Sequence, residues 1–389
     1  MGINTEKYIW LAQKWSQPGV KIHKLLSALG GIDGVYAADR KMLSRLDILL
    51  PEEIKRLNDK DGREAFEIIE ECRRKQIDII TIEDRRYPER LRKIYNPPLI
   101  LYIKGRLPDC DKTASITIVG TRNPSKDGIS ICDRLSKDLA RSGFIIVSGM
   151  ARGIDAAAHK GALVAEGITV AVLGCGVDVA YPEENRELMK YIIENGAVIS
   201  EYPPGTRPDK LNFPMRNRIL AGLTLGTVVV EAPDKSGALI TARQASDEGR
   251  DVFAVPGSVY TSPGTNNLIK SGAKPVTEAL DVIEEYAYMF SDIPSVKVHE
   301  SSKQSHVILK VASAEPEYKI QKQKSDADDL ALTDEERLIK ASMTADSEVD
   351  ADTISRKTNL PIGTVLATLT YLELKGHVKR LPGGRYILD

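Results

Sequence analysis

The chain has 389 residues, of which 42% are hydrophobic and 28% are charged, a composition typical of a soluble globular protein with two or three domains. The formal net charge is −1, so a nucleic-acid site would need a local cluster of Arg, Lys and backbone N–H groups instead of a basic surface overall. No apolar run is long enough to cross a bilayer, and the first residues lack the pattern of a secretion signal, so we expect a cytoplasmic protein without a membrane partner.

The first 80 residues predict a small helical domain. Apolar residues recur at helical spacing in residues 8–12, 22–29 and 65–69. A glycine-rich turn at residues 29–34 could present backbone N–H groups to a phosphate, but a helix C-cap followed by a turn is the commoner use of such glycines. We therefore interpret this turn as a helix end.

Residues 81–290 predict an α/β domain. Its apolar runs are continuous, as expected of parallel strands that are buried on both faces of a sheet, and the intervals between them leave room for crossover helices. The expected strands are residues 116–119, 144–147, 169–173, 197–199, 227–230 and 252–255. Between the first two strands, Ile129, Cys132, Leu135 and Leu139 fall on one helical face. The pattern predicts a Rossmann-like, doubly wound parallel sheet.

The last hundred residues divide into a polar stretch and a small domain. Residues 291–330 are polar and cannot bury enough surface to fold alone, so we expect a linker. Residues 331–389 contain three helical patterns, at 335–342, 351–357 and 361–375, followed by two short strands around a Pro-Gly-Gly turn. Three helices and a hairpin predict a winged helix-turn-helix domain.

The candidate binding residues follow the predicted strands. Ligands of an open parallel sheet bind outside the carboxyl ends of its strands, and residues 120–123, 148–155, 174–176 and 256–258 stand there. These segments are rich in glycine, which lets backbone N–H groups approach an anion, and Arg122 and Arg152 add phosphate donors. Residues 212–219 and 235–242 open helices with the same character. Any one of these turns alone is an ordinary connection between a strand and a helix, but together they favour a phosphate-binding edge.

Cofactor, metal and catalytic motifs are sparse. No Gly-x-Gly-x-x-Gly follows the first strand and no Walker A sequence is present, so we expect no cofactor. Four widely spaced cysteines, Cys72, Cys110, Cys132 and Cys175, show no metal-ligand spacing and are expected to be buried thiols. Asp155, Glu231 and His159 are the candidate catalytic groups, but helix capping explains Asp155 and helix packing explains His159 equally well. We therefore expect a binding protein and not an enzyme.

Five segments resemble the DprA family, also called Smf, of bacterial DNA-processing proteins. They are residues 119–122, 148–155, 213–219, 236–242 and 255–257, and the similarity extends through the helical start and the C-terminal domain. The resemblance implies a helical domain similar to a sterile-alpha-motif fold, and a Rossmann-like domain that binds single-stranded DNA and forms a homodimer. It further implies that the protein protects incoming DNA and loads the recombinase RecA onto it during natural transformation.

Carried over position by position, the resemblance gives a set of DNA-contacting candidates. They are Gly120, Thr121, Arg122, Ser148, Gly149, Arg152, Gly153, Arg216, Asn217, Arg218, Ser236 and Gly237. The loop at Tyr181-Pro182 departs from the family, since Glu183 and Glu184 stand where a basic residue often follows, and we assign it no contact. The winged helix, with Lys379 and Arg385, could contact duplex phosphates or dock a protein.

Two other functions remain open at this point. Similar Rossmann-like folds hydrolyse nucleoside monophosphates, but the paired glycines of their phosphate loop are absent here, so only the fold supports that interpretation. A transcription regulator with a small-molecule sensor domain would also carry a winged helix, and a tight preference for one duplex sequence would favour it.

Overall fold

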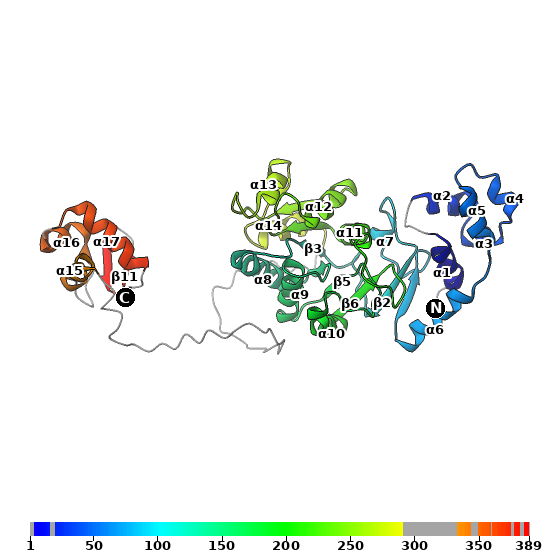
Figure 1. Ribbon diagram of the computed structural model, residues 1–389, viewed down its shortest axis with the longest axis horizontal. Helices are drawn as coiled ribbons and strands as arrows, with labels where there is room; N and C mark the ends of the chain where they lie inside the picture. The colour runs from blue at the N-terminus through cyan, green and yellow to red at the C-terminus, as the bar shows by residue number, and fades with distance from the viewer. Residues whose placement is uncertain are drawn as a thin grey trace. The chain divides into compact units, whose positions relative to one another are not determined.

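The computed structural model describes residues 4–15, 20–290, 333–343, 349–358, 360–374, 377–381 and 385–388. The predicted linker at 291–330 lies outside the described residues. The chain divides into two compact units, residues 1–311 and 312–389, and each is described by itself (Figure 1).

A nine-stranded sheet forms the centre of the first unit, in the order β1-β2-β6-β5-β4-β3-β7-β8-β9. Its strands are β1 (Asp78–Thr81), β2 (Ile100–Gly105), β3 (Ser115–Val119), β4 (Ile145–Ser148), β5 (Thr169–Val172), β6 (Gly196–Ser200), β7 (Gly226–Val229), β8 (Asp251–Ala254) and β9 (Lys274–Pro275). The seven strands from β6 to β9 pair in parallel, and β1 and β2 extend the sheet in antiparallel register. All six predicted strands are confirmed.

The sequence patterns did not reveal β1 and β2. The other strands were located by the alternation of strand and crossover helix. The antiparallel strands β1 and β2 are not part of that alternation, so it gave no signal for them. The chain order of the parallel strands reverses at β3, which pairs with β4 on one side and β7 on the other. This reversal makes the sheet doubly wound, and it creates a crevice between the loops that follow β3 and β7.

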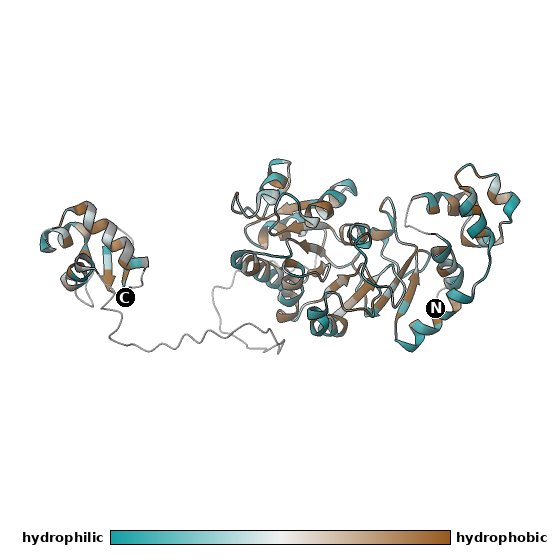
Figure 2. Cartoon of the chain, in the orientation of Figure 1, coloured by the Kyte–Doolittle hydropathy of each residue, from teal (hydrophilic) through white to brown (hydrophobic). Residues whose placement is uncertain are grey.

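Helices cover both faces of the sheet (Figure 1). One layer contains α8 (Lys126–Arg141), α9 (Ile154–Val164) and α10 (Arg186–Asn195), with α14 (Leu280–Tyr286) beside them in the same core. The other contains α7 (Glu89–Arg92), α11 (Asn212–Leu223), α12 (Gly237–Asp247) and α13 (Pro263–Lys270). In Figure 2 the strands are mostly hydrophobic, whereas the helices turn hydrophilic faces outward. Of the predicted helical face, Cys132, Leu135 and Leu139 are buried and Ile129 is exposed.

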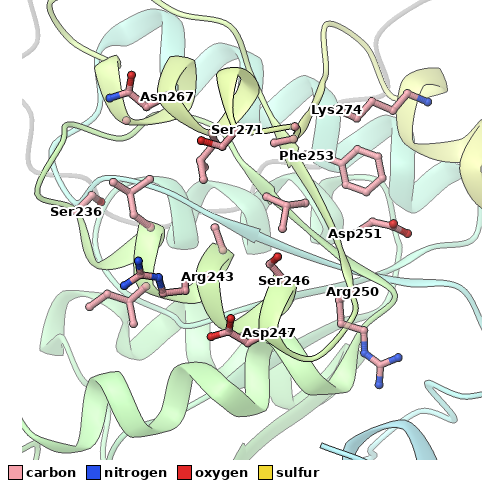
Figure 3. A pocket seen from close by; sticks show the side chains of 18 of the residues that line it. Ser236, Arg243, Ser246, Asp247, Arg250, Asp251, Phe253, Asn267, Ser271 and Lys274 are labelled. Carbon is pink, nitrogen blue, oxygen red and sulfur yellow. The ribbon is translucent and has the colours of Figure 1, made fainter.

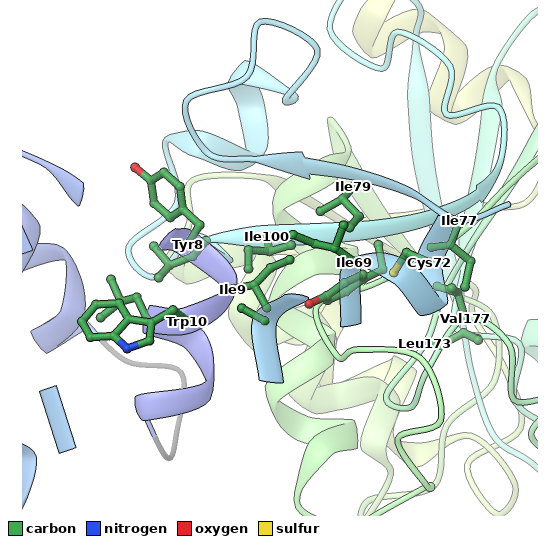
Figure 4. Close-up of a cluster of buried hydrophobic side chains, with 14 of the residues drawn as sticks. Tyr8, Ile9, Trp10, Ile69, Cys72, Ile77, Ile79, Ile100, Leu173 and Val177 are labelled. Carbon is green, nitrogen blue, oxygen red and sulfur yellow. The ribbon is translucent and has the colours of Figure 1, made fainter. Parts of the chain in front are cut away.

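The N-terminal region is helical, as predicted, and it shares a core with the sheet. Its helices are α1 (Thr5–Lys14), α2 (Val20–Ala28), α3 (Ile32–Ala37), α4 (Arg40–Ser44), α5 (Pro51–Asn58) and α6 (Arg63–Arg74). Ile9 of α1 and Ile69 of α6 pack toward Ile100 at the start of β2 (Figure 4). The expected domain boundary at residue 80 therefore falls inside β1, and the helices and the antiparallel strands bury one continuous set of side chains.

The glycine-rich turn after α2 is a helix end, as interpreted from the sequence. Gly30 and Gly31 have φ angles of 73° and 104°, in the left-handed region that favours glycine. The N–H of Gly31 donates to the carbonyl of Leu26 at 2.8 Å, which satisfies one of the last carbonyls of the helix.

The second unit is a winged helix. It consists of α15 (Asp334–Ser342), β10 (Val349–Asp350), α16 (Ala351–Thr358), α17 (Ile362–Leu374), β11 (Val378–Leu381) and β12 (Arg385–Leu388). Thr333 and Glu336 form a capping box at the start of α15. Ile339, Ile354 and Leu369, one from each helix, are fully buried together. The predicted three helices and hairpin are confirmed, while the Pro-Gly-Gly turn between the last two strands lies outside the described residues.

No helix within the described ranges is both long and apolar enough to span a bilayer. All four cysteines are buried and free, as expected. Within the same ranges, no group of three or more potential metal ligands comes together.

Candidate nucleic-acid interface

A cleft of about 510 Å³ lies where the sheet reverses, at the carboxyl ends of β3 and β7. It is lined by residues from the loops after five neighbouring strands, namely Gly120, Thr121, Arg122, Ala151, Asp155, Tyr181, Lys210, Phe213, Arg216, Asn217, Lys235, Ser236 and Gly237 among others. Seven of the twelve predicted contact residues line it: Gly120, Thr121, Arg122, Arg216, Asn217, Ser236 and Gly237. We refer to this hollow as the cleft.

The loop after β3 is fixed to the loop after β7 by Glu231. The N–H of Thr121 donates to the carbonyl of Glu231 at 2.7 Å. The Ser125 hydroxyl donates to the Glu231 carboxylate at 2.6 Å, and the Ser125 N–H adds a longer bond at 3.1 Å. Glu231 is 7% exposed and bonded on all these sides, so it anchors the loop that presents Arg122. This placement explains the carboxylate without a catalytic role.

Two aromatic rings and a guanidinium are layered at the rim of the cleft. The rings of Tyr181 and Phe213 stack with centroids 5.5 Å apart and an interplanar angle of 27°. The Arg122 guanidinium lies 5.7 Å from the centroid of the Phe213 ring, within cation–π range. Tyr181 remains 40% exposed, so a ring surface is accessible beside a cation. Planar bases stack on such surfaces in proteins that bind single strands.

The side chains that reach solvent at the cleft give it a positive charge. Arg122, Lys210 and Lys235 are exposed, and none of them forms an ion pair with a carboxylate of the described chain. Asp155 is the acidic residue among the lining side chains, and it is buried. The cleft therefore combines three exposed cations with one carboxylate that solvent does not reach.

The N-terminus of α12 opens into the same cleft. The Ser236 hydroxyl caps the helix by accepting a hydrogen bond from the N–H of Ala238 at 3.3 Å. Gly237 is exposed, and an added Cβ there would meet no heavy atom within 4 Å. The first N–H groups of a helix lack intrahelical partners and carry partial positive charge, so they suit an anion.

Arg216, a predicted phosphate donor, is instead part of the cleft's floor. The residue is 5% exposed, and its Nη1 donates to the carbonyls of Gly149, at 2.9 Å, and Val172. These carbonyls end β4 and the following strand β5, so the guanidinium ties together two strand ends. Burial lowers the pKa of Arg216, and the neighbouring Asp155 opposes that shift. Its role as a direct contact is corrected to that of a positioning residue.

Asp155 and His159 of α9 are both buried. Burial raises the pKa of Asp155, while Arg216 and the N–H groups of the surrounding turn lower it. His159 is fully buried, and its Nδ1 lies 2.7 Å from the Thr169 hydroxyl. Because that hydroxyl donates to the carbonyl of Ile146, it accepts from Nδ1–H, so Nδ1 carries a proton. Burial lowers the pKa of His159 to about 3. The packing interpretation of His159 is confirmed.

Three of the four predicted residues at the end of β4 and in the loop after it, Ser148, Gly149 and Gly153, shape the turn. Ser148 is fully buried, and its hydroxyl donates to the carbonyl of Ile118 at 2.6 Å. A Cβ on Gly149 would lie 2.6 Å from the Arg216 Nη2, and one on Gly153 would lie 2.4 Å from the carbonyl oxygen of Thr121. Gly153 also has a φ of 75°. Close packing explains all three, so we no longer assign a DNA contact to Ser148 or Gly149.

Asn217 and Arg218 are also engaged by hydrogen bonds within the protein. Asn217 is 9% exposed and accepts a hydrogen bond from the Arg216 Nε at 3.2 Å. Arg218 pairs with Glu201 at 2.6 Å, and both side chains are less than 10% exposed. Burial raises the pKa of Glu201, and Arg218 opposes the shift. Arg218 therefore binds the segment after β6 and is also removed from the contact set.

Arg152 is exposed but neutralised by a neighbour. Its Nε and Nη2 donate to the two carboxylate oxygens of Glu184 at 2.6 and 2.7 Å. Glu184 belongs to the short 3-10 helix η1 (Glu183–Asn185), the segment that departs from the family pattern. One of the two acidic residues that depart from the family pattern, Glu184, therefore pairs with Arg152, a predicted DNA contact.

A larger groove, of about 1170 Å³, lies between α12 and α13 over β8. Figure 3 shows Phe253 among its lining residues, with Arg243 and Asp247 of α12 on one side and Asn267 of α13 and Ser271, which directly follows that helix, on the other. Its lining charges balance, since the bases Lys235, Arg243, Arg250 and Lys274 accompany the acids Asp234, Asp247, Asp251 and Glu285. A polyphosphate gains little from such a surface, so the larger hollow is not the better nucleic-acid site.

The predicted contact set left out four residues of the cleft, Tyr181, Lys210, Phe213 and Lys235, although Phe213 and Lys235 stand in the predicted segments 212–219 and 235–242. Lys210 and Lys235 each stand two residues before the first residue of a helix, α11 or α12, where a positive charge adds to the helix N-terminus. Their position before a helix was therefore a usable signal. Tyr181 lies in the loop after β5 and Phe213 in the first turn of α11, and only the fold brings their rings together.

The fold and the cleft define a class: a doubly wound α/β protein with exposed cations and stacked aromatic rings in a cleft at its topological switch point, and with a winged helix. The sequence model described as "DNA recombination-mediator protein A" matches residues 78–287, and that described as "DprA winged helix domain" matches residues 323–384. The chain belongs to the DprA/Smf family.

Individual relatives agree with this assignment. The chain is 35% identical to Protein Smf of Synechocystis over 98% of its own length and 99% of the relative's. It is 44% identical to the DNA processing protein DprA of Bacillus subtilis over 55% of the chain and 72% of the relative. The crystal structure of DprA from Streptococcus pneumoniae matches 73% of this chain and 99% of that one, with 37% identity and a TM-score of 0.65.

A second solved structure concerns DNA binding. DNA processing protein A from Helicobacter pylori matches 55% of this chain and 97% of that one, with 30% identity and a TM-score of 0.51. That structure is described as revealing a unique mode of single-stranded DNA binding by the Helicobacter pylori protein.

Proposed function

We propose that this chain binds single-stranded DNA in the cleft. The observation that carries the proposal is the layered set of Tyr181, Phe213 and Arg122 beside two unpaired lysines and the open N-terminus of α12. Such a site offers one kind of contact to a phosphate and another to a base. Membership of a DNA-processing family and the single-strand binding described for the Helicobacter pylori relative support the same ligand.

The two kinds of contact divide between the residues. Arg122, Lys210 and Lys235 hold phosphates, together with the N–H groups at Ser236 and Gly237. The exposed face of Tyr181 accepts a base by stacking. Bases in a duplex are already stacked on one another, so this arrangement favours single strands.

Of the residues predicted from sequence, the proposed contacts keep Gly120, Thr121, Arg122, Ser236 and Gly237. Gly153 is kept for the shape of the adjoining turn, and Arg152 as a rim cation that Glu184 holds. Arg216 and Asn217 form the floor. Tyr181, Lys210, Phe213 and Lys235 are added.

The finer parts of the function rest on family membership. We propose that the protein acts in the cytoplasm as a homodimer, covers incoming single strands during natural transformation, and loads RecA onto them. It would do so as a carrier without catalytic turnover. The neutral groove and the winged helix are surfaces that a protein partner could use, and we assign neither to a particular partner.

The proposal is tested by the binding of fluorescent oligonucleotides to the full chain over a range of salt concentrations. The wild type should bind single strands more tightly than duplexes, and its affinity should fall steeply with salt. Arg122→Ala should weaken binding to several unrelated sequences alike and reduce the slope of log K against log salt by about 0.7, the value for one phosphate contact on a single strand.

Arg141→Ala is the matched control. Arg141 is an exposed arginine at the C-terminal end of α8, the end that lies away from the loop carrying Arg122. Its removal should leave the salt slope unchanged. Equal affinities and slopes for the wild type and Arg122→Ala, or rapid release of free base from nucleoside monophosphates, would contradict the proposal.

The recombinase step has its own measurement. RecA hydrolyses ATP when it is assembled on single strands, so the rate of ATP hydrolysis should rise faster when this protein is added to strands that a single-strand-binding protein has already covered. Sedimentation velocity of the same preparation determines whether it is a dimer. Unchanged RecA kinetics would remove the loading role and leave DNA binding in place.

A further inference from the structure

The cleft lies at the edge of the sheet where the parallel strands have their carboxyl ends. The most exposed aromatic side chain described at this edge is in the loop between β8 and α13. Val259 and Tyr260 stand at its tip and are 69% and 91% exposed. Since β8 runs parallel to β7, this loop leaves the sheet at the same edge as the loops that form the cleft. Tyr260 is therefore a candidate for contact with a strand that continues beyond the cleft.

The loop is held at both ends by its neighbours. The Asn266 side chain brackets Gly257, accepting from its N–H at 3.2 Å and donating to its carbonyl at 2.9 Å. The N–H of Ala232 donates to the Ser262 hydroxyl at 3.1 Å, and the N–H of Gly264 donates to the carbonyl of Ala232 at 2.9 Å. Because Ala232 begins the loop that also carries Lys235, the fold fixes the base of the Tyr260 loop to a wall of the cleft.

The tip is closed by bonds of its own. The N–H of Tyr260 donates to the Ser258 hydroxyl at 3.2 Å, and the N–H of Ser262 donates to the carbonyl of Ser258 at 2.8 Å. A turn built in this way holds both side chains largely in water, and the Tyr260 ring buries almost no surface in the fold. The free energy that an exposed ring and a neighbouring valine would gain by burial is thus available to a ligand.

The order of the strands places Tyr260 in line with the cleft. Along the edge of the sheet the loops follow the order β5, β4, β3, β7, β8, so that Tyr181, Arg122, Lys235 and Tyr260 occur in that sequence. From β3 to β8 is two interstrand spacings, or about 10 Å. A single-stranded DNA that passes Arg122 and Lys235 would therefore reach the Tyr260 loop within a few nucleotides.

We infer that Tyr260, supported by Val259, is a second base-stacking position that extends the single-strand path from the cleft across β7 to the loop after β8. The inference rests on the proposed function, because it requires DNA in the cleft. Stacking on Tyr260 would raise the affinity for DNA that is long enough to extend beyond the cleft. It would not change the affinity for shorter oligonucleotides that fit within the cleft. The contact is by stacking, so it contributes affinity without adding a charge.

The test measures the affinity of the full chain for fluorescent oligo-dT of increasing length. Tyr260→Ala should match the wild type on the shortest oligonucleotide that binds and bind longer ones about tenfold more weakly, the usual scale for losing one stacked base. Tyr260→Phe keeps the ring and should behave as the wild type. The salt slope of Tyr260→Ala should stay unchanged, unlike that of Arg122→Ala. Since the ring is 91% exposed, the substitution should not affect folding.

Tyr95→Ala provides the matched control. Tyr95 is 75% exposed, and its backbone N–H bonds to Glu248 just after the end of α12, the opposite end from Ser236. It should bind all lengths as the wild type does. A longer oligonucleotide that lacks one base provides a second test. When the missing base is the one that stacks on Tyr260, Tyr260→Ala and the wild type should bind this oligonucleotide with equal affinity.

Three outcomes separate the possibilities. Equal affinities of Tyr260→Ala and the wild type at every length would overturn the inference and leave the cleft as the DNA site. Unchanged DNA affinity together with an altered sedimentation coefficient would also overturn it, and would assign the exposed tip to a protein contact. A wild type that binds no single strand at any length would remove the proposed function itself, and this inference with it.

Discussion

The cleft and the groove share the turn at Lys235, Ser236 and Gly237 but differ in charge. The groove is about twice as large, yet its four bases face four acids around an apolar floor. The cleft exposes three cations, and its carboxylate, Asp155, is buried under Arg216. Volume alone would have pointed to the groove. The balance of exposed charge, and the presence of stacked rings, are the reasons why we propose the cleft as the site for a polyanion.

The two hollows also differ in how their charged residues are supported. Beneath the cleft, the buried Arg216 donates to the carbonyls of Gly149 and Val172 at the ends of β4 and β5, with the buried carboxyl of Asp155 near it. In the groove, Lys274 pairs with Glu285 at 2.5 Å with both side chains more than a third exposed. Substitutions under the cleft should therefore alter stability, whereas those in the groove should not.

Removing Arg216 should have the largest effect. Arg216→Met leaves the carbonyls of Gly149 and Val172 without their donor and Asp155 without its neighbouring cation, so the free energy of unfolding should fall by about 3 to 5 kcal/mol. Urea denaturation followed by circular dichroism measures the change. Arg122→Met, which removes an exposed guanidinium, should change stability by less than about 0.5 kcal/mol. Equal stability of Arg216→Met and the wild type would refute the structural role.

His159 should make stability depend on pH. Its pKa is about 3 in the folded protein and near 6.5 in an unfolded chain. As the pH falls below about 6.5, His159 becomes protonated in the unfolded chain, whereas in the folded protein it stays neutral until near pH 3. The free energy of unfolding should therefore fall by about 1.4 kcal/mol per pH unit in this window because of this ring.

His159→Gln isolates this contribution, because glutamine does not titrate. Between pH 6 and pH 4.5 its free energy of unfolding should decline less steeply than that of the wild type, by about one proton's slope. Asp155 has a raised pKa and contributes with the opposite sign, but it is present in both proteins and cancels in the difference. Parallel pH profiles would show that His159 is protonated in the folded state.

Charge reversal should separate the two hollows by their affinity for DNA. Lys210 in the cleft and Arg243 in the groove are both exposed and form no ion pair with a described carboxylate, so they are matched. Lys210→Glu should weaken single-strand binding about tenfold at low salt, and Arg243→Glu should change it by at most about threefold through long-range repulsion. If Arg243→Glu has the larger effect in oligonucleotide titrations, the strand follows the groove instead.

Releasing Arg152 should have the smallest effect, and it should increase affinity. Glu184→Gln removes the carboxylate that holds this guanidinium at the rim, so single-strand affinity should rise about two- to threefold at low salt and less at high salt. Glu187→Gln is the control, since Glu187 is an exposed acid paired with Lys190 on α10. A rise of the same size in both variants would show only a general effect of net charge.

Local patterns in the sequence specified most of the fold. The strands β3 to β8 are continuous apolar runs because both of their faces are covered, and such runs are visible without a structure. The winged helix was equally accessible, since each helix has an apolar face and the hairpin a turn of proline and glycine. The antiparallel pair β1 and β2 was not, because short strands outside the strand–helix alternation leave no periodic signal.

The sequence predicted the location of the candidate site better than it predicted which side chains face a ligand there. The glycine-rich loops and arginines do converge on one edge, since parallel strands place their carboxyl ends together. Within the run Arg216-Asn217-Arg218, however, successive residues of α11 point in directions about 100° apart. Arg216 therefore meets the ends of β4 and β5, and Arg218 meets Glu201, while Lys210 just before the helix stays in solvent.

Hydrophobic period and glycine placement are local properties of the chain, and they were enough to specify the layers of the sheet domain, the winged helix and the edge where a ligand would bind. The folded structure was needed to show which cations reach solvent, which rings stack, and that Glu184 pairs with Arg152. These depend on distances between residues far apart in the chain, and a buried guanidinium and an exposed one are written with the same letter.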